Sequence, residues 1–499
     1  MHHCIATIKS WLQRCNGQHE GCPSPKPKLP TRLLYITEKI VQLVETESLP
    51  YSPYLTLSHC WGNDPANMLK TTTKTLERHR RGIEWGQLPA VFRDALTITK
   101  AVGCQWIWID SLCIVQDDED DWGKESLEMA NVYSNSVLNI AATFSSNSSN
   151  TFFRNRCPFD GDGPQLFARL AHWPTHAMIT GQFGFLPGRT EPDRIAPLLQ
   201  RAWVFQERLL APRTVHIGSS ELIWECNSSL MCECGGISAT QQGLKPRFAD
   251  ACQGRSSREE VLDLWDRIVE IYSGLRLTKP SDRSNALSGI SSQLSSILKC
   301  DYLDGIWGID AARGLLWETN MAPAARVSED CPSWSWMWRY DLETSRSKVF
   351  YKNLHMDPRL RVQFSASRCE DHDGDHSEVV RSSRLHVKGF MLRATLTHRN
   401  QKVYSDSSAM SVETWELKIG SSINRWFPDC EASDRLEGLE EVLCVLGGTN
   451  KYGFLCGLVV AQLGGEGTLY RRVGQAFLDW ETRDDGMFDH GEMMSVELV

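Results

Sequence analysis

The chain has 499 residues, of which 53 are Lys or Arg and 62 are Asp or Glu, and its formal net charge is −9. This length exceeds that of one typical domain and supplies enough apolar material for two to four packed units without disulfide support. The acidic balance argues against nucleic acid or an anionic membrane as the main partner, and it favours a small molecule or a protein.

The beginning of the chain and the cysteines both indicate a soluble cytoplasmic protein. The opening segment, MHHCIATIKSWLQRC, lacks the uninterrupted apolar core of a signal peptide, and no run of eighteen apolar residues follows. The 17 cysteines are scattered through apolar segments rather than set at a disulfide-rich spacing. We therefore expect mostly buried thiols, no membrane and no nucleic-acid partner.

The first elements predicted along the chain are a helix, a link, and then a strand, helix and strand in succession. The helical lead IATIKSWLQRC precedes a Pro/Lys-rich link, CPSPKPKLP. The first strong strand signal is YLTLSHCW, which begins at Tyr54. Val91, Ala95 and Ile98 then follow helical spacing, and Gly103 is placed to stop that helix. The buried strand CQWIWID follows directly.

The next segment reads as an acid-rich helix followed by a third buried strand, VLNIAAT. Ser126, Met129 and Tyr133 share one helical face, and the acids crowd the N-terminal end, where the helix dipole favours them. Alternating strands and helices are the signature of an open α/β sheet with parallel strands. We therefore predict an α/β domain over residues 46–235, after a helical lead and linker over residues 1–45.

The remaining chain is predicted to contain a hairpin, a helical region and a β-rich region. RTVHIGSSELIWEC indicates a hairpin that turns at GSS. Residues 236–330 are expected to be helical, with Val261 and Ile268 on one apolar stripe. Residues 331–499 alternate in short β-like runs around the polar link CEDHDGDHSE at 369–378, which predicts a smaller β-rich unit.

Polar residues follow the predicted strands at the edge where an open parallel sheet binds its ligands. In such a sheet, ligands lie beyond the carboxyl ends of the strands. The first strand ends in Ser58 and His59, and the second ends at Asp110. Glu207, on a later helix that begins near Arg201, is a carboxylate that can reach the same edge.

Each of these residues also has a plainer interpretation. Consecutive side chains of a strand point to opposite faces, which disfavours a Ser/His or Cys/His nucleophile and favours a structural role for His59. Asp110 could cap the loop after its strand. Glu207 could be a surface acid paired with Arg201 or Arg208, or an anchor buried against a Trp-rich core. From the residues alone, both interpretations stay open.

Two groups of cysteines invite comparison with zinc ligands. They are Cys226, Cys232 and Cys234 in one group, and Cys15, His19 and Cys22 in the other. Neither group has a standard ligand spacing or a clear fourth ligand, so we expect no metal at either. The chain also has no P-loop and no GxGxxG motif, so we expect no resident cofactor.

Three long motifs together resemble the fungal heterokaryon-incompatibility (HET) domain family. In chain order they are YLTLSHCWG, LPAVFRDALTITKAVGCQWIWIDSLCIVQDDEDDWGKESLEMANVYSNS and QRAWVFQERLLAPRTVHIGSSELIWEC. The resemblance continues in WLQRCNGQHEGC, LWDRIVEIYSGLRLTKPSDRSNALSGI and PSWSW, so it covers most of the chain. It implies a role in fungal self/non-self recognition and programmed cell death.

The HET domain is held to be a distant relative of the Toll/interleukin-receptor (TIR) fold, a flavodoxin-like sheet whose enzymatic members cleave NAD+. YLTLSHCWGND resembles the first strand and following loop of that fold. Trp203, followed four residues later by Glu207, resembles its tryptophan and catalytic glutamate. The resemblance implies that Glu207 is catalytic and that NAD+ or a related nucleotide is the substrate. We expect these residues to line the substrate site: Ser58, His59, Trp61, Asp110, Arg201 and Trp203.

A lone glutamate suffices for this chemistry. Breaking the nicotinamide–ribose bond passes through an oxocarbenium-like state, which a nearby carboxylate stabilises, and cationic nicotinamide leaves without a general acid. Two other functions stay open. One is a non-enzymatic signalling module that self-associates or recruits protein partners, and the other is a HET-like scaffold co-opted as a metabolic enzyme that tailors a small molecule.

Overall fold

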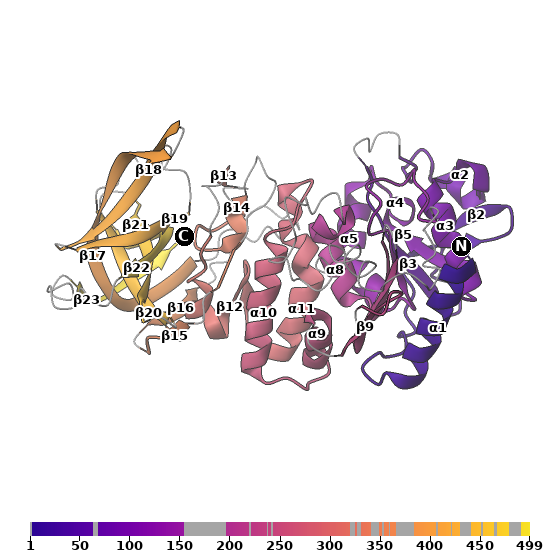
Figure 1. The fold of residues 1–499 in the computed structure, drawn as a ribbon, viewed down its shortest axis with the longest axis horizontal. Helices are drawn as coiled ribbons and strands as arrows, with labels where there is room; N and C mark the ends of the chain where they lie inside the picture. The colour runs from indigo at the N-terminus through magenta and orange to yellow at the C-terminus, as the bar shows by residue number, and fades with distance from the viewer. Residues whose placement is uncertain are drawn as a thin grey trace, which may run out of the picture. The chain divides into compact units, whose positions relative to one another are not determined.

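The computed structural model divides into two compact units (Figure 1). Unit 1 comprises Met1–Leu264 and Asn285–Ile297, and unit 2 comprises Trp265–Ser284 and Leu298–Val499. The helical region expected over residues 236–330 is thus shared between the units. The described residues are 2–62, 68–153, 196–218, 221–236, 238–240, 243–319, 325–326, 331–340, 349–351, 354–358, 360–365, 384–405, 408–420, 422–429, 441–450, 453–463, 467–478 and 491–499.

Unit 1 is built on a mixed ten-stranded sheet with parallel strands at its centre. β3 pairs in parallel with β5 and with β6, and β6 pairs in parallel with β7. These are the strands predicted from YLTLSHCW, CQWIWID, VLNIAAT and RTVHI, so the α/β fold class is confirmed. In spatial order the ten strands are β10 (Ser238–Thr240), β9 (Ser229–Cys232), β8 (Leu222–Cys226), β7 (Arg213–Ile217), β6 (Asn139–Ala141), β3 (Tyr54–Ser58), β5 (Trp106–Ile109), β1 (Arg32–Ile36), β2 (Ile40–Glu45) and β4 (Ile83–Glu84).

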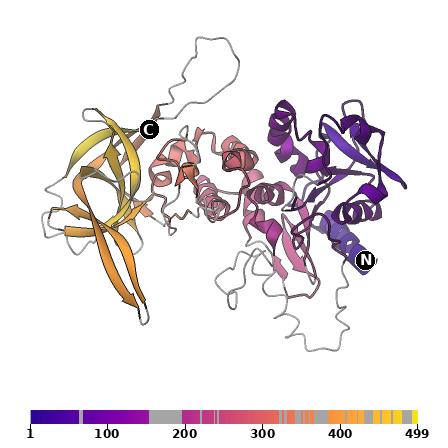
Figure 2. The ribbon, with the colours of Figure 1, turned by 90° about the horizontal axis from the view of Figure 1, so that it is seen from above.

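The parallel strands have a flavodoxin-like order. They lie as β5-β3-β6-β7, which is 2-1-3-4 in order of the chain, and the switch point falls between β3 and β6. Because the chain reverses direction across the sheet after β5, its crossover helices cover opposite faces. α3 (Ala90–Ala101) covers one face, whereas α5 (Glu119–Ser134) and α8 (Ala202–Leu210) lie side by side on the other (Figure 1 and Figure 2). A ligand is expected at the carboxyl ends of β3 and β6.

The crossover helices follow the apolar patterns of the sequence. In α3, Val91 and Ile98 are buried, and Gly103 beyond its end has a φ of +89°, a conformation that glycine adopts without strain. In α5, the side chain of Asp118 accepts hydrogen bonds from backbone N–H groups of the first turn, while Tyr133 is buried against the sheet. The predicted helices are therefore confirmed, and Asp118, the residue just before α5, caps that helix.

Antiparallel strands extend the sheet at both edges. The hairpin of β7 and β8 is confirmed, although residues 219–220 of its predicted turn lie outside the described residues. The helical lead is confirmed as α1 (His2–Gln18). Arg32–Ile36 and Ile40–Glu45, in contrast, form a hairpin against β5 where the sequence analysis predicted a linker. That prediction was wrong because each strand is short, and five or six apolar-rich residues give too weak a periodic signal beside a Pro-rich link.

Unit 2 contains the β-rich C-terminal region that the sequence predicts. Pairing of β17 with β20 closes its nine-stranded sheet into a ring of strands. Trp334, Trp336 and Trp338 are buried, so packing accounts for the PSWSWMW motif. The polar link 369–378 lies outside the described residues. The nine strands are β15 (Leu354–Met356), β16 (Arg361–Ser365), β17 (Arg384–Ser405), β18 (Ser408–Ile419), β19 (Ser422–Pro428), β20 (Glu441–Asn450), β21 (Leu455–Gln462), β22 (Leu469–Leu478) and β23 (Gly491–Leu498).

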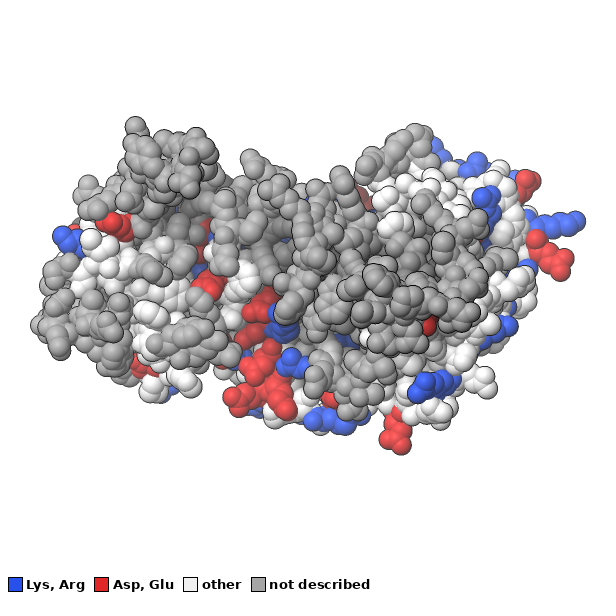
Figure 3. Space-filling view, viewed as in Figure 1, with Lys and Arg blue, Asp and Glu red and all other residues white. Residues whose placement is uncertain are grey.

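The remaining helices and the surface charges of the described residues complete the description of the fold. Helices not yet named are α2 (Leu76–Arg81), α4 (Asp110–Cys113), α9 (Leu244–Cys252), α10 (Arg258–Tyr272), α11 (Asn285–Leu298) and α12 (Ala311–Gly314). None of the described helices combines the length and apolar character needed to cross a membrane. On the face drawn in Figure 3, the described Lys and Arg side chains are interspersed with Asp and Glu.

Candidate active site

Glu207 is carried by α8, a short helix that directly precedes β7. The helix ends where Pro212 disfavours a helical backbone at the preceding residue, and Ala211 is accordingly extended. Most of α8 is buried, and the Gln206 side-chain oxygen accepts a hydrogen bond of 2.8 Å from the backbone N–H of Gly289. These contacts hold α8, and with it Glu207, in a fixed position within unit 1.

The Glu207 carboxylate is buried and incompletely partnered. The residue is 6% exposed, and burial raises the pKa of Glu207 to about 7. Hydrogen bonding from the Ser58 and Tyr133 hydroxyls opposes this rise, as does the positive charge of Arg201, whereas the negative charge of Asp110 adds to it. Among the described residues, Glu207 Oε2 has no hydrogen-bond partner. A buried polar atom without a partner costs about 1–3 kcal/mol, so its position calls for an explanation.

Ser58 is held in place at the switch point of the sheet. It is the last residue of β3 and is buried. Asn139, at the start of β6, donates a hydrogen bond of 3.0 Å from Nδ2 to Ser58 Oγ, and its Oδ1 accepts one of 3.0 Å from the Thr56 hydroxyl. This buried network fixes the Ser58 hydroxyl, which lies beside the Glu207 carboxylate.

The Asp110 carboxylate accepts hydrogen bonds from two neighbours. Its Oδ1 accepts the backbone N–H of Ser111 at 2.7 Å. Its Oδ2 accepts the indole N–H of Trp61 at 2.8 Å, which holds that ring beside the strand ends. The Asp110 side chain is 24% exposed, so solvent reaches this side of the site.

His59 and Cys60 both have the character of structural residues. His59 lies with Nδ1 3.5 Å from Asp110 Oδ1, and its ring meets Phe92 edge-on at 5.0 Å. Burial lowers the pKa of His59, so the ring is neutral near pH 7. Burial likewise raises the pKa of the Cys60 thiol, which packs in an apolar cluster with Leu198. A protonated buried thiol is a poor nucleophile, in agreement with the low weight that the sequence gave to a Cys/His pair.

The structure also places Arg201 and Trp203 close to the site. The charge of Arg201 acts on both Glu207 and Cys60. Trp203 is half-buried and meets Trp122 of α5 edge-on, with ring centroids 6.4 Å apart. Trp203 therefore contributes to the contact between α8 and α5 and lies one helical turn before Glu207.

The sequence analysis gave no site role to Tyr133. It placed this residue on the buried face of α5, and burial does raise the pKa of Tyr133 well above its ordinary value. The sequence signal available was only the helical spacing, which cannot show that α5 lies beside α8. The packing of the two helices brings the Tyr133 hydroxyl to Glu207.

Arg208, which the sequence offered as a partner for Glu207, pairs instead with Glu225. Arg208 Nε lies 2.7 Å from Glu225 Oε2, and its Nη2 lies 2.8 Å from Oε1, a bidentate pair. His216 Nε2 is 3.1 Å from the same carboxylate. The positive charges of Arg208 and Lys245 help hold the pKa of Glu225 well below its ordinary value, against the opposing effect of burial. Glu207 is therefore left without this counter-charge.

Comparison with known proteins identifies the segment that carries the site. Residues 54–207 match the family model described as Heterokaryon incompatibility protein (HET). The chain carries a HET domain. The match begins at the first residue of β3 and ends on Glu207, so the HET domain spans the switch point and every candidate site residue. No curated protein and no solved structure matches the chain.

Proposed function

We propose that this HET-domain protein cleaves the bond between nicotinamide and ribose in NAD+ or a related nucleotide, with Glu207 as the catalytic carboxylate. The observation that carries this proposal is the unpartnered Oε2 atom of a buried Glu207 at the carboxyl edge of a flavodoxin-like sheet. The four-residue spacing of Trp203 and Glu207, which resembles that of TIR enzymes, supports the same proposal.

The chemistry requires a negative charge beside the ribose as the bond breaks. The electron pair of the C1′–N bond moves to the nicotinamide ring, which leaves as a neutral molecule, and the ribose becomes an oxocarbenium ion. The ionised Glu207 would stabilise that cation, and water would then add at C1′ and release one proton. Because the nicotinamide ring carries the positive charge before cleavage, the site needs no second catalytic acid.

The neighbouring residues suit this role. Ser58 and Tyr133 stabilise the ionised form of Glu207 by hydrogen bonding, and Arg201 does so through its charge. Asp110 opposes ionisation and orients Trp61, whose indole could stack on a ring of the substrate. We propose that substrate enters past the exposed part of Asp110.

The proposed role in fungal self/non-self recognition and cell death rests on the family. The match to the HET family supports a heterokaryon-incompatibility type of protein. A protein that consumes NAD+ whenever it is present would harm its own cell, so we propose that association with a partner or a second copy raises its activity.

The test is incubation of the purified full chain with NAD+ over a series of protein concentrations, with nicotinamide release followed by chromatography. We expect release by the wild type and a loss of at least about 10²-fold in Glu207→Gln, which keeps the shape of the side chain and removes the charge. Glu128→Gln is the matched control, because Glu128 lies on α5 with its side chain 40% exposed and pairs with Lys28. Equal release by folded Glu207→Gln would rule out the proposed role of Glu207, and no release by the wild type would favour a non-enzymatic signalling module.

A further inference from the structure

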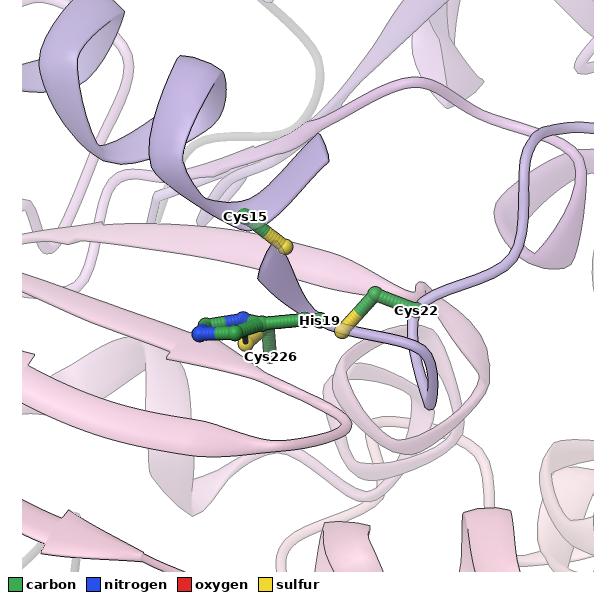
Figure 4. Close-up of side chains that lie close together, drawn as sticks. All are labelled: Cys15, His19, Cys22 and Cys226. Carbon is green, nitrogen blue, oxygen red and sulfur yellow. Dashed lines mark hydrogen bonds between the residues drawn. The ribbon is translucent and has the colours of Figure 1, made fainter. Parts of the chain in front are cut away.

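A second group of chemically active side chains lies away from the Glu207 site, at the junction of α1 with the β8–β9 hairpin. Its members are Cys15, His19, Cys22 and Cys226, called here the Cys3His cluster. One Sγ or ring-nitrogen atom from each lies within 4.8 Å of the others (Figure 4). The sequence analysis considered the first three together and found no fourth ligand, because Cys226 lies 207 positions after His19.

The spacing of the four ligand atoms is compatible with a tetrahedral zinc site. Zinc bonds of about 2.3 Å to sulfur and 2.0 Å to nitrogen place neighbouring ligand atoms roughly 3.5–3.8 Å apart. Cys226 Sγ lies 3.3 Å from His19 Nδ1, and the remaining atoms fall within the same small volume. Cys15 lies in the last turn of α1, His19 and Cys22 lie in the segment that follows this helix, and Cys226 is the last residue of β8, so the four side chains converge from two segments (Figure 4).

Each sulfur of the cluster also has a hydrogen-bond donor beside it. Arg213 Nε donates to Cys15 Sγ at 3.3 Å. The hydroxyl of Ser228 lies 3.6 Å from Cys22 Sγ, and that of Ser229 lies 3.3 Å from Cys226 Sγ. Donors of this kind orient metal-bound thiolates and offset their charge.

Arg213 provides an independent indication of negative charge at the cluster. This residue is 2% exposed, and its remaining hydrogen bonds go to the backbone oxygens of Cys22 and Pro23. No carboxylate among the described residues pairs with its guanidinium. A buried charge without a counter-ion is costly, whereas three thiolates, one neutral imidazole and one Zn²⁺ carry a net charge of about −1 that would balance it.

We propose that the Cys3His cluster binds one zinc ion. The site supplies four protein ligands and leaves no open position, which is typical of a structural zinc rather than a catalytic one. Binding would release the protons of the three thiols and require His19 to be neutral. The ion would join α1 to β8, which lies in the antiparallel part of the sheet next to β7, and would thereby stabilise unit 1.

The other cysteine group differs in a way that supplies a control. Cys232 and Cys234 lie close together with Glu221, and these three ligand atoms also fall within 4.8 Å of one another. This group has three candidate ligands among the described residues, and the Sγ atoms of its two cysteines are 3.3 Å apart. Cys234 is on the same part of the chain as Cys226, but among the described residues its group has three ligands rather than four, so a serine there should leave the zinc in place.

The first test measures metal in the full chain purified without chelator. Elemental analysis should give about one zinc per chain, and the X-ray absorption spectrum should fit a shell of three sulfurs and one nitrogen. A Co²⁺-exchanged sample should show intense thiolate-to-cobalt absorption. Absence of bound metal together with no thiolate-to-cobalt absorption on titration with Co²⁺ would overturn the proposal, as would iron or copper in place of zinc.

Variants assign the ion to its ligands. We expect Cys226→Ser and His19→Ala to lose the zinc, whereas Cys234→Ser should retain it fully. Ser229→Ala, which removes a donor but no ligand, should weaken Zn²⁺ affinity by about 10-fold, measured by competition with a chelator. Should Cys226→Ser not fold, Ser229→Ala and the wild-type sulfur shell still decide the assignment. Loss of zinc in Cys234→Ser with retention in Cys226→Ser would place the metal elsewhere and contradict the proposal.

Discussion

Two buried carboxylates of unit 1, Glu207 and Glu225, lie close in the chain and have opposite pKa shifts. Burial raises the pKa of Glu207 to about 7, whereas its cationic neighbours hold the pKa of Glu225 well below the ordinary value. Both residues are less than a tenth exposed. The difference therefore lies in their partners rather than in their burial.

The comparison shows that adjacent residues of one helix can have different roles. Arg208 directs its guanidinium to Glu225 and forms a bidentate pair with it. Glu207, the residue before it, has hydroxyl neighbours and one buried oxygen without a described partner. A fully paired carboxylate contributes to structure, while an incompletely paired one near its pKa at neutral pH is suited to act on a ligand.

The largest effect on stability is expected at the paired carboxylate. Glu225→Gln would leave the largely buried positive charge of Arg208 without its counter-ion, which should lower the free energy of unfolding by about 3 kcal/mol. Chemical denaturation at pH 7 measures this change. Glu128→Gln, on the surface, should change stability by less than about 0.5 kcal/mol. A Glu225→Gln variant as stable as the wild type would contradict the structural role.

A smaller effect with a distinct pH dependence is expected at Glu207. Its folded-state pKa of about 7 exceeds the ordinary 4.5, so the folded state holds the proton more tightly than the unfolded state between these values. The wild type should therefore lose stability as the pH rises from about 4.5 to 7, by about 3 kcal/mol in total. Glu207→Gln cannot ionise and should lack this loss. Denaturation of both proteins at pH 5 and pH 8 tests it, and parallel pH curves would refute the assigned environment.

The smallest effects should come from the neighbours of Glu207, and they have opposite signs. Ser58→Ala removes a hydrogen bond to the ionised carboxylate and should raise the pKa of Glu207 by roughly one unit. Asp110→Asn removes a negative charge and should lower the pKa of Glu207. This shift should be smaller than that of Ser58→Ala, because Asp110 is partly exposed. The pH midpoint of the Glu207-dependent stability change reports both shifts. Shifts of the same sign in the two variants would show that charge and hydrogen bonding do not control this residue.

The sequence predicted the parts of the structure that depend on local pattern. Helical spacing placed α3 and α5, and the strand runs placed β3, β5 and β6 and thereby the edge where Ser58 and Asp110 lie. The short strands β1 and β2 were missed, because a few apolar residues beside a Pro-rich link give little periodic signal.

The sequence could not predict which residues that lie far apart in the chain become neighbours in the fold. Nothing in the helical spacing shows that Tyr133 lies beside Glu207, because this depends on how α5 packs on α8. Arg208 was an equally good candidate partner for Glu207 until the structure paired it with Glu225. Cys226 likewise joins Cys15 only through the docking of α1 on the sheet.

The most direct test of the central claim is the pH dependence of nicotinamide release from NAD+ by wild type and Glu207→Gln. Because the ionised carboxylate is the active form, kcat/KM of the wild type should rise about tenfold per pH unit below pH 7 and level off above it. Glu207→Gln should stay at the background rate throughout. A wild-type profile flat from pH 5 to 9, or a variant with the same profile as the wild type, would contradict the assignment of Glu207 as the catalytic carboxylate.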